Sequence, residues 1–156
     1  MRLAELLDLH GYGTTEGAVR GWDTRGRANH PEWNKGVHLT IFQRSKRPNQ
    51  HRTSAKKFFT QPVPAAAEKE RVAREFLKAK ETGTETVNAR MDVTPMQTSL
   101  LPSRLERARQ GLQSGRLKGK TPVVFRFEGK QYVMDGHHRL AFESSRGQRS
   151  TVRVFQ

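Results

Sequence analysis

The sequence predicts a small α+β domain over residues 84–156, in the order strand, helix, hairpin, helix, strand. Three observations lead to this prediction. Two runs rich in β-branched and aromatic residues, Pro122–Phe127 and Lys130–Met134, are separated by Glu128-Gly129, which is a strong hairpin signal. A helical pattern with one apolar face precedes the hairpin. A glycine turn and a second helical pattern follow it.

Local signals place the first strand and the first helix of this unit. Val87–Val93 predicts the strand, which stops before Pro95. Ser103, with Glu106 three residues later, predicts a capping box at the start of the helix, which is expected to end near Gly115. The apolar face of that helix is formed by Leu105, Ala108 and Leu112.

The remaining predicted elements are a helix and a strand at the end of the unit and one helix ahead of it. The late helix is expected to run from His137 to near Gly147, before a last strand at Thr151–Phe155. The early helix, Ala65–Lys80, has one apolar face and is ended by Gly83. Because a unit of about 70 residues buries little surface by itself, we expect this helix to pack on it.

Residues 1–64 are expected to form a basic, largely irregular N-terminal arm, followed by the amphipathic helix over residues 65–83. Glycines recur through the arm without an apolar period. Residues 1–10 have the pattern of a short amphipathic helix, and Val37–Phe42 has that of an edge strand. An arm that cannot build its own core can order against another surface, so a homo-oligomer or a larger nucleoprotein assembly is one expectation.

The charge balance points to a polyanionic partner. The 156 residues include 29 Lys and Arg against 15 Asp and Glu, a net charge of +14. Nucleic acid is the first expectation, with DNA favoured over RNA, and charge that serves only solubility or another acidic surface is the alternative. The chain has no cysteine, which leaves the compartment undetermined by redox argument. It has no apolar run long enough for a membrane span and no long apolar core of a secretory signal, so we expect a cytoplasmic protein, or a virion protein if a phage encodes it.

The densest basic stretch follows the expected edge strand and ends at two aromatic residues, Phe58-Phe59. Cations beside aromatic rings suit phosphate neutralisation with base stacking. A solvated linker whose aromatic rings enter the core is the equal alternative. The candidate nucleic-acid-binding residues are Arg44, Lys46, Arg47, Arg52, Lys56 and Lys57.

The turn Asp135-Gly136-His137-His138-Arg139 is the candidate active site. A helix start carries unpaired N–H groups and partial positive charge, so Gly136, His138 and Arg139 are expected to bind phosphate. Arg139 can grip a phosphate bidentately, the histidines can move a proton near neutral pH, and Asp135 could hold Mg²⁺ or act as a base. The turn is expected to expose both histidines and the arginine. An ordinary helix start with surface histidines is the alternative.

Three segments together resemble the ParB/sulfiredoxin superfamily. They are Thr94–Gln97, Gly119–Val124 and Tyr132–Ala141, and the resemblance covers about residues 87–155. It implies a fold that binds nucleotide phosphates at this helix start, with ATP or CTP and Mg²⁺ as the expected cofactors. His137 stands where sulfiredoxin has cysteine, and the Gly-Glu-Arg-Arg of partition proteins is absent. The motif looks closer to ParB-like nucleases and to free serine kinases.

Three functions follow as expectations. The first is a ParB-like, nucleic-acid-associated enzyme, a Mg²⁺-dependent nuclease or nucleotide hydrolase, with Asp135, His137, His138 and Arg139 as catalytic residues. The second is a non-catalytic basic module that binds DNA or RNA or assembles a nucleoprotein such as a virion. The third is a small-molecule kinase of the free serine kinase type.

Overall fold

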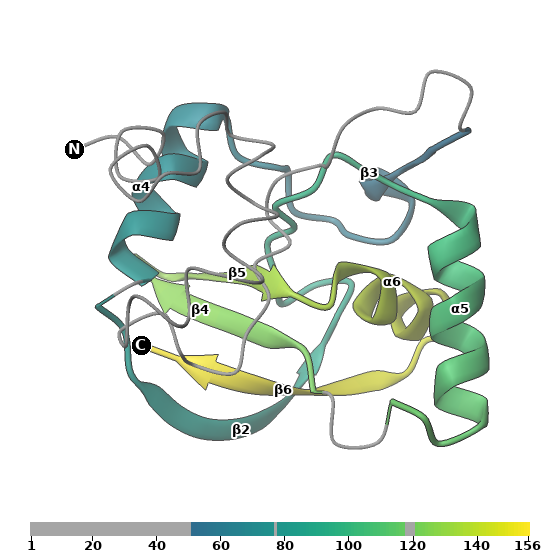
Figure 1. The fold of residues 1–156 in the computed structure, drawn as a ribbon. Coiled ribbons are helices and arrows are strands. Elements are labelled where there is room, and N and C mark those ends of the chain that lie inside the picture. The colour runs from purple at the N-terminus through teal and green to yellow at the C-terminus, as the bar shows by residue number, and fades with distance from the viewer. Residues whose placement is uncertain (1–50, 77, 118–120) are drawn as a thin grey trace, which may run out of the picture.

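The computed structural model describes residues 51–76, 78–117 and 121–156 (Figure 1). The expected helix at residues 1–10, the expected edge strand Val37–Phe42 and the candidate residues Arg44, Lys46 and Arg47 lie outside these ranges. The described elements are, in chain order, β1 (Thr53–Ser54), η3 (Ala55–Lys57), α4 (Ala66–Phe76), β2 (Glu81–Asn88), β3 (Ser99–Leu100), α5 (Pro102–Gln113), β4 (Val123–Phe127), β5 (Lys130–Asp135), α6 (His137–Ser145) and β6 (Arg149–Phe155).

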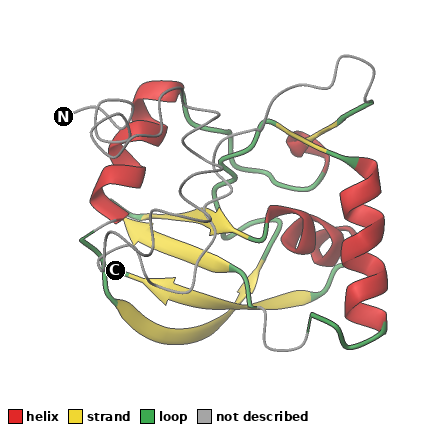
Figure 2. Ribbon diagram, viewed as in Figure 1, coloured by secondary structure: helices red, strands yellow, loops and turns green. Residues whose placement is uncertain are grey.

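The described chain is a small α+β domain, as predicted, and its main sheet has the strand order β2-β6-β4-β5 (Figure 2). β6 pairs antiparallel with β2 and parallel with β4, while β4 and β5 form the predicted hairpin. At the hairpin turn both Glu128 and Gly129 have positive φ, 50° and 78°, as a type I′ turn requires. A separate two-stranded pair joins β1 to β3, with Thr53 opposite Leu100.

α4 covers one face of the sheet through aromatic contacts. The ring of Phe76 meets Phe125 of β4 at 5.5 Å and Phe155 of β6 at 5.3 Å between centroids, edge to face in both cases. Val72 and Ala73 of the same helix are also buried. The expectation that this helix packs on the domain is confirmed, although the helix ends at Phe76 and not at residue 80.

α6 covers the opposite face, and α5 packs against α6 (Figure 1). Because neighbouring strand residues point to opposite faces, Val124, Val133 and Val154 face away from α4. They form a buried cluster with Leu140 and Ala141 of α6. The sheet therefore has an aromatic core on one face and an aliphatic core on the other. None of the helices in the described ranges has the length and apolarity to cross a membrane.

The last part of the expected arm belongs to the domain. Ala55 and Phe59 are buried in the aliphatic core, and Phe58 packs against it. The N–H of Ala55 donates to the carbonyl of Thr98 at 2.9 Å, and the Ser144 hydroxyl of α6 donates to the carbonyl of Phe58. The two phenylalanines therefore serve the core, which was the alternative to base stacking.

The first strand of the main sheet begins and ends earlier than predicted. β2 stops at Asn88, whose N–H donates to Asp92 Oδ2 at 2.8 Å and whose Oδ1 accepts from the N–H of Arg90 at 3.0 Å. This is a side-chain-stabilised turn of the kind that asparagine favours. The prediction of a strand through Val93 is wrong for that reason, and Gly83, expected to end a helix, lies inside β2.

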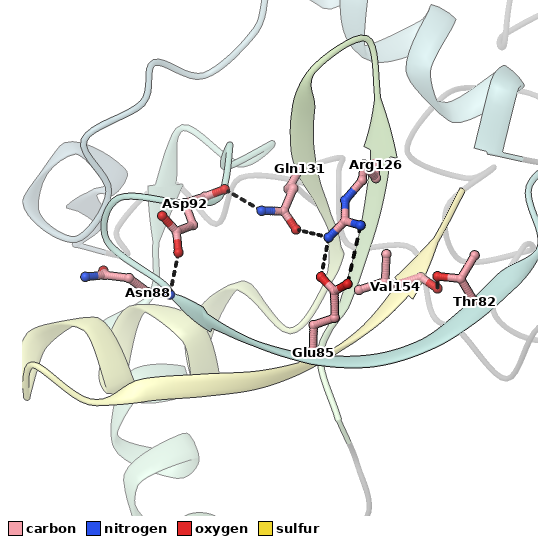
Figure 3. Close-up of polar contacts among 7 residues, drawn as sticks. All are labelled: Thr82, Glu85, Asn88, Asp92, Arg126, Gln131 and Val154. Carbon is pink, nitrogen blue, oxygen red and sulfur yellow. Dashed lines mark hydrogen bonds and ion pairs between the residues drawn. The ribbon is translucent and has the colours of Figure 1, made fainter.

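A polar row crosses the sheet beside this turn (Figure 3). Gln131 of β5 donates to the carbonyl of Asp92 at 3.1 Å and accepts a hydrogen bond from Arg126 of β4 at 3.2 Å. Arg126 also forms an ion pair with Glu85 of β2. Since β6 lies between β2 and β4, this row ties together strands that are not hydrogen-bonded neighbours.

α5 starts by a different device from the predicted capping box. Its N-cap is Leu101, in extended backbone and with no side-chain cap, and Pro102 follows at the first helical position. Proline suits that position because it has no N–H to leave unpaired. Ser103 lies inside the helix, and Glu106 pairs with Arg109 one turn later. The capping-box prediction is wrong, and the helix itself is confirmed.

Candidate functional site

The turn between β5 and α6 strongly favours glycine. Gly136 is the N-cap of α6 and has φ of 91°, a left-handed conformation that side chains disfavour. A Cβ atom there would lie 2.7 Å from Cβ of Pro122 and 3.0 Å from its Cα. The carbonyl of Gly136 accepts the first helical hydrogen bond, from the N–H of Leu140 at 3.0 Å. Backbone strain and close packing therefore fix where α6 begins.

His137 is an internal connector and is not exposed as predicted. Its side chain is only 1% exposed, and Nε2 accepts a hydrogen bond from the N–H of Met96 at 2.9 Å. Burial, and then the nearby charges of His138 and Lys69, hold the pKa of His137 well below its ordinary value. The imidazole is therefore neutral, with its proton assigned to Nδ1 because Nε2 accepts. This bond joins the Thr94–Gln97 segment to the start of α6.

His138 joins the start of α6 to the start of α5 in the same way, by accepting a hydrogen bond from a backbone N–H. Its Nε2 accepts from the N–H of Leu101, the N-cap of α5, at 3.2 Å. Burial, and then the positive charges of Arg104 and Arg52, lower the pKa of His138 to about 4. Both histidines are consequently neutral at pH 7, and the one basic lone pair of each ring is engaged by a backbone N–H.

Arg139 points along the helix toward the end of α5. Its Nη1 donates to the carbonyl of Leu117 at 3.1 Å, and its Nε lies 3.6 Å from Oε1 of Glu143, one turn later in α6. The two side chains are 18% and 11% exposed. The expectation of an exposed Arg139 is wrong, because the carbonyl and the carboxylate draw the guanidinium into the α5–α6 contact.

Asp135 ends β5 opposite Val123, which is also the partner of Arg153 on β6. The pKa of Arg153 is raised mainly by its hydrogen bond to Glu81, and more weakly by the charge of Asp135. In the described ranges no three His, Asp or Glu side chains gather as a metal site. Mg²⁺ is often held by one or two carboxylates together with substrate phosphates, and Asp135 is the residue here that could supply one.

Three cations from other segments act on the histidines at the start of α6. The pairing of Thr53 with Leu100 brings Arg52 beside Leu101, and the charges of Arg104 and Arg52 both lower the pKa of His138. The charge of Lys69, in α4, acts on His137. Lys69 is half-buried, burial lowers its pKa, and it forms no ion pair with any described residue.

The structure thus brings together only part of the predicted site. Arg52 lies beside the turn, whereas Lys56 and Lys57 are exposed on η3. Lys69 and Arg104 were missed, because both lie within helices and belong to no local motif. Comparisons of the chain with protein-family models, with curated proteins and with solved structures found no match.

The burial of His137 predicts a loss of stability in acid. In the unfolded chain His137 takes up a proton near pH 6.5, and in the folded protein it does not. The contribution of the buried His137 to the free energy of unfolding is therefore complete above that pH and falls as the pH drops. We expect the free energy of unfolding to fall by about 2 kcal/mol from this group between pH 7 and pH 5. Urea unfolding of the wild type and of His137→Gln at both pH values measures it.

The matched control is His51→Gln, because His51 is exposed. It should lose as much stability in acid as the wild type, whereas His137→Gln should lose less. An equal acid loss in all three proteins would contradict the assignment of His137 as a neutral buried acceptor.

Proposed function

We propose that this protein is a ParB-like nucleic-acid-binding protein that receives backbone phosphates at the start of α6. The observation that carries the proposal is the convergence of Arg52, Arg104 and Lys69 on a helix N-terminus whose two histidines are neutral. A helix N-terminus favours anions through its N–H groups and its dipole. Arg52 and Arg104 add positive charge near His138, and Lys69 adds it near His137.

The wider charge distribution supports a polyanion as the ligand. Glu81, Glu85, Glu106 and Glu128 each pair with an arginine, so much of the acidic charge in the described chain is already neutralised. Arg52 and Lys69 have no such pairing among the described residues. With a net charge of +14 over the chain, phosphate neutralisation is expected to supply most of the affinity.

The histidine geometry favours binding over hydrolysis. A general base needs a free lone pair within reach of the proton that it removes. The Nε2 lone pairs of His137 and His138 are engaged by the N–H groups of Met96 and Leu101. The non-catalytic module therefore fits the site better than the nuclease. The resemblance to the ParB/sulfiredoxin superfamily agrees with phosphate recognition at this helix start.

A pair of double variants tests the location of binding. Arg52→Ala with Arg104→Ala removes two charges beside the site. Arg146→Ala with Arg149→Ala removes two exposed charges at the far end of α6. Fluorescence anisotropy with a short labelled DNA duplex should show binding at least tenfold weaker for the first pair. The slope of log affinity against log salt should fall by about 2 for that pair, one unit for each lost phosphate contact.

The control pair should bind within about threefold of the wild type at the same salt concentration, because it lies away from the start of α6. Equal weakening by both pairs would mean that net charge alone attracts DNA and would contradict a site. Plasmid incubated with the pure protein and Mg²⁺ or Mn²⁺ should stay intact. Cleavage that is lost in Asp135→Ala would instead support the nuclease.

A further inference from the structure

We propose that His138 couples phosphate binding at the start of α6 to proton uptake, so that the site holds DNA more tightly in mildly acidic solution. This inference rests on the proposed function and adds a regulation to the same site. It stands on the position of His138, whose ring accepts a hydrogen bond from the N–H of Leu101 beside Arg52, and on which the charges of Arg52 and Arg104 act.

Leu101 is the centre of these contacts. Its N–H donates to His138 Nε2 at 3.2 Å, and its carbonyl accepts from the N–H of Arg104 at 2.9 Å. The residue before it, Leu100, pairs with Thr53 and so brings Arg52 alongside. His138 is thus held in a corner between α6, α5 and the short β1–β3 pair.

The charged groups that act on His138 oppose its protonation. They are Arg104 of α5 and Arg52 ahead of β1, while His137, next to it on the same helix, is neutral. Burial acts in the same direction, and together with the arginines it holds the pKa of His138 at about 4. An anion bound between Arg52 and Arg104 would neutralise the positive charges of these two arginines.

When His138 takes up a proton, the hydrogen bond that it loses can be replaced by hydrogen bonds to the bound phosphate. One proton from solvent adds to Nε2 of His138, which then donates and can no longer accept from the N–H of Leu101. The new N–H can donate to a phosphate oxygen, and the N–H of Leu101, at the N-cap of α5, becomes able to donate to the same anion. Binding and protonation therefore favour each other by the same free energy.

Duplex DNA is a suitable probe, because its phosphodiester charges do not change across this pH range. Burial is the largest cause of the low pKa of His138, so the hydrogen bond from the protonated ring to the anion must offset it while the anion neutralises the arginines. If the two effects together restore the ordinary histidine pKa of about 6.5, affinity should rise about tenfold between pH 8 and pH 5.5. Calorimetric titration at pH 6 in two buffers of different ionisation enthalpy should show net proton uptake. His138→Gln should lose most of the affinity gain and of the uptake.

His51→Gln is the control, since it removes an exposed histidine and should keep the full gain. Equal gains in the wild type and in His138→Gln, or no gain in either, would overturn this inference while leaving DNA binding at the site in place. A failure to bind DNA at any of these pH values would overturn the proposed function as well. NMR titration of the wild-type imidazole signals, with and without DNA, gives a reading that needs no variant: one depressed histidine pKa should rise when DNA is added.

Discussion

Replacing Gly136 with alanine is expected to lower the free energy of unfolding by about 2–5 kcal/mol. The left-handed backbone at φ 91° costs about 1–2 kcal/mol for an ordinary residue. The new Cβ would also meet Pro122 at 2.7 Å. Overpacking of this kind costs about 1–3 kcal/mol, because Pro122 is buried and rigid. Urea unfolding monitored by circular dichroism measures the sum.

Gly129→Ala separates the cost of the left-handed backbone from the cost of overpacking. Gly129 also has positive φ, 78°, but nothing lies within 4 Å of the position that its Cβ would take. It should therefore show the backbone cost alone, about 1–2 kcal/mol. If both variants lost the same stability, the packing of Pro122 against the turn would contribute nothing to the start of α6.

Truncation of Arg139 is expected to destabilise the domain by about 3 kcal/mol. The change leaves Glu143, which is 11% exposed, without its ion-pair partner and leaves the carbonyl of Leu117 without a donor. Removing one partner of a buried charge pair costs about 3–5 kcal/mol, and the 3.6 Å separation here argues for the lower end. Thermal and urea unfolding of Arg139→Ala measure the loss.

Two further variants make this prediction specific. Arg146→Ala removes an exposed arginine from the end of the same helix, where its guanidinium lies 5.6 Å from the ring centroid of Phe142, and should change stability by less than about 1 kcal/mol. Arg139→Met combined with Glu143→Leu replaces the pair by apolar groups and should recover most of the loss. An Arg139→Ala protein that kept full stability but lost DNA binding would contradict this structural role and support the sequence prediction that Arg139 binds phosphate.

The sequence predicted best those elements that are specified by neighbouring residues. The β4–β5 hairpin follows from Glu128-Gly129, and the start of α6 follows from Gly136. β2 was misplaced because its first six residues are exposed and show no alternation of polar and apolar side chains. Its pairing with β6 joins residues such as Glu85 and Val152 that no local pattern connects.

The same distinction between local and distant contacts applies to the candidate site. The turn was found from sequence, because strand, glycine and helix signals are adjacent. The direction of each side chain was not, because its partner is distant: Met96 for His137 is 41 positions away, and Leu117 for Arg139 is 22 positions away. His137 and Arg139 look like exposed catalytic residues in the sequence. In the structure each forms a hydrogen bond that links two distant segments of the domain.

The position of β6 between β2 and β4 has a consequence for synthesis on the ribosome. While residues 149–155 are still inside the exit tunnel, β2 has no partner among the described strands. β4 also lacks its parallel partner at that stage. The earlier strands and helices must then wait, with apolar surface uncovered, for the strand that completes the sheet. We expect this domain to acquire protease resistance only when that strand emerges, in one late step.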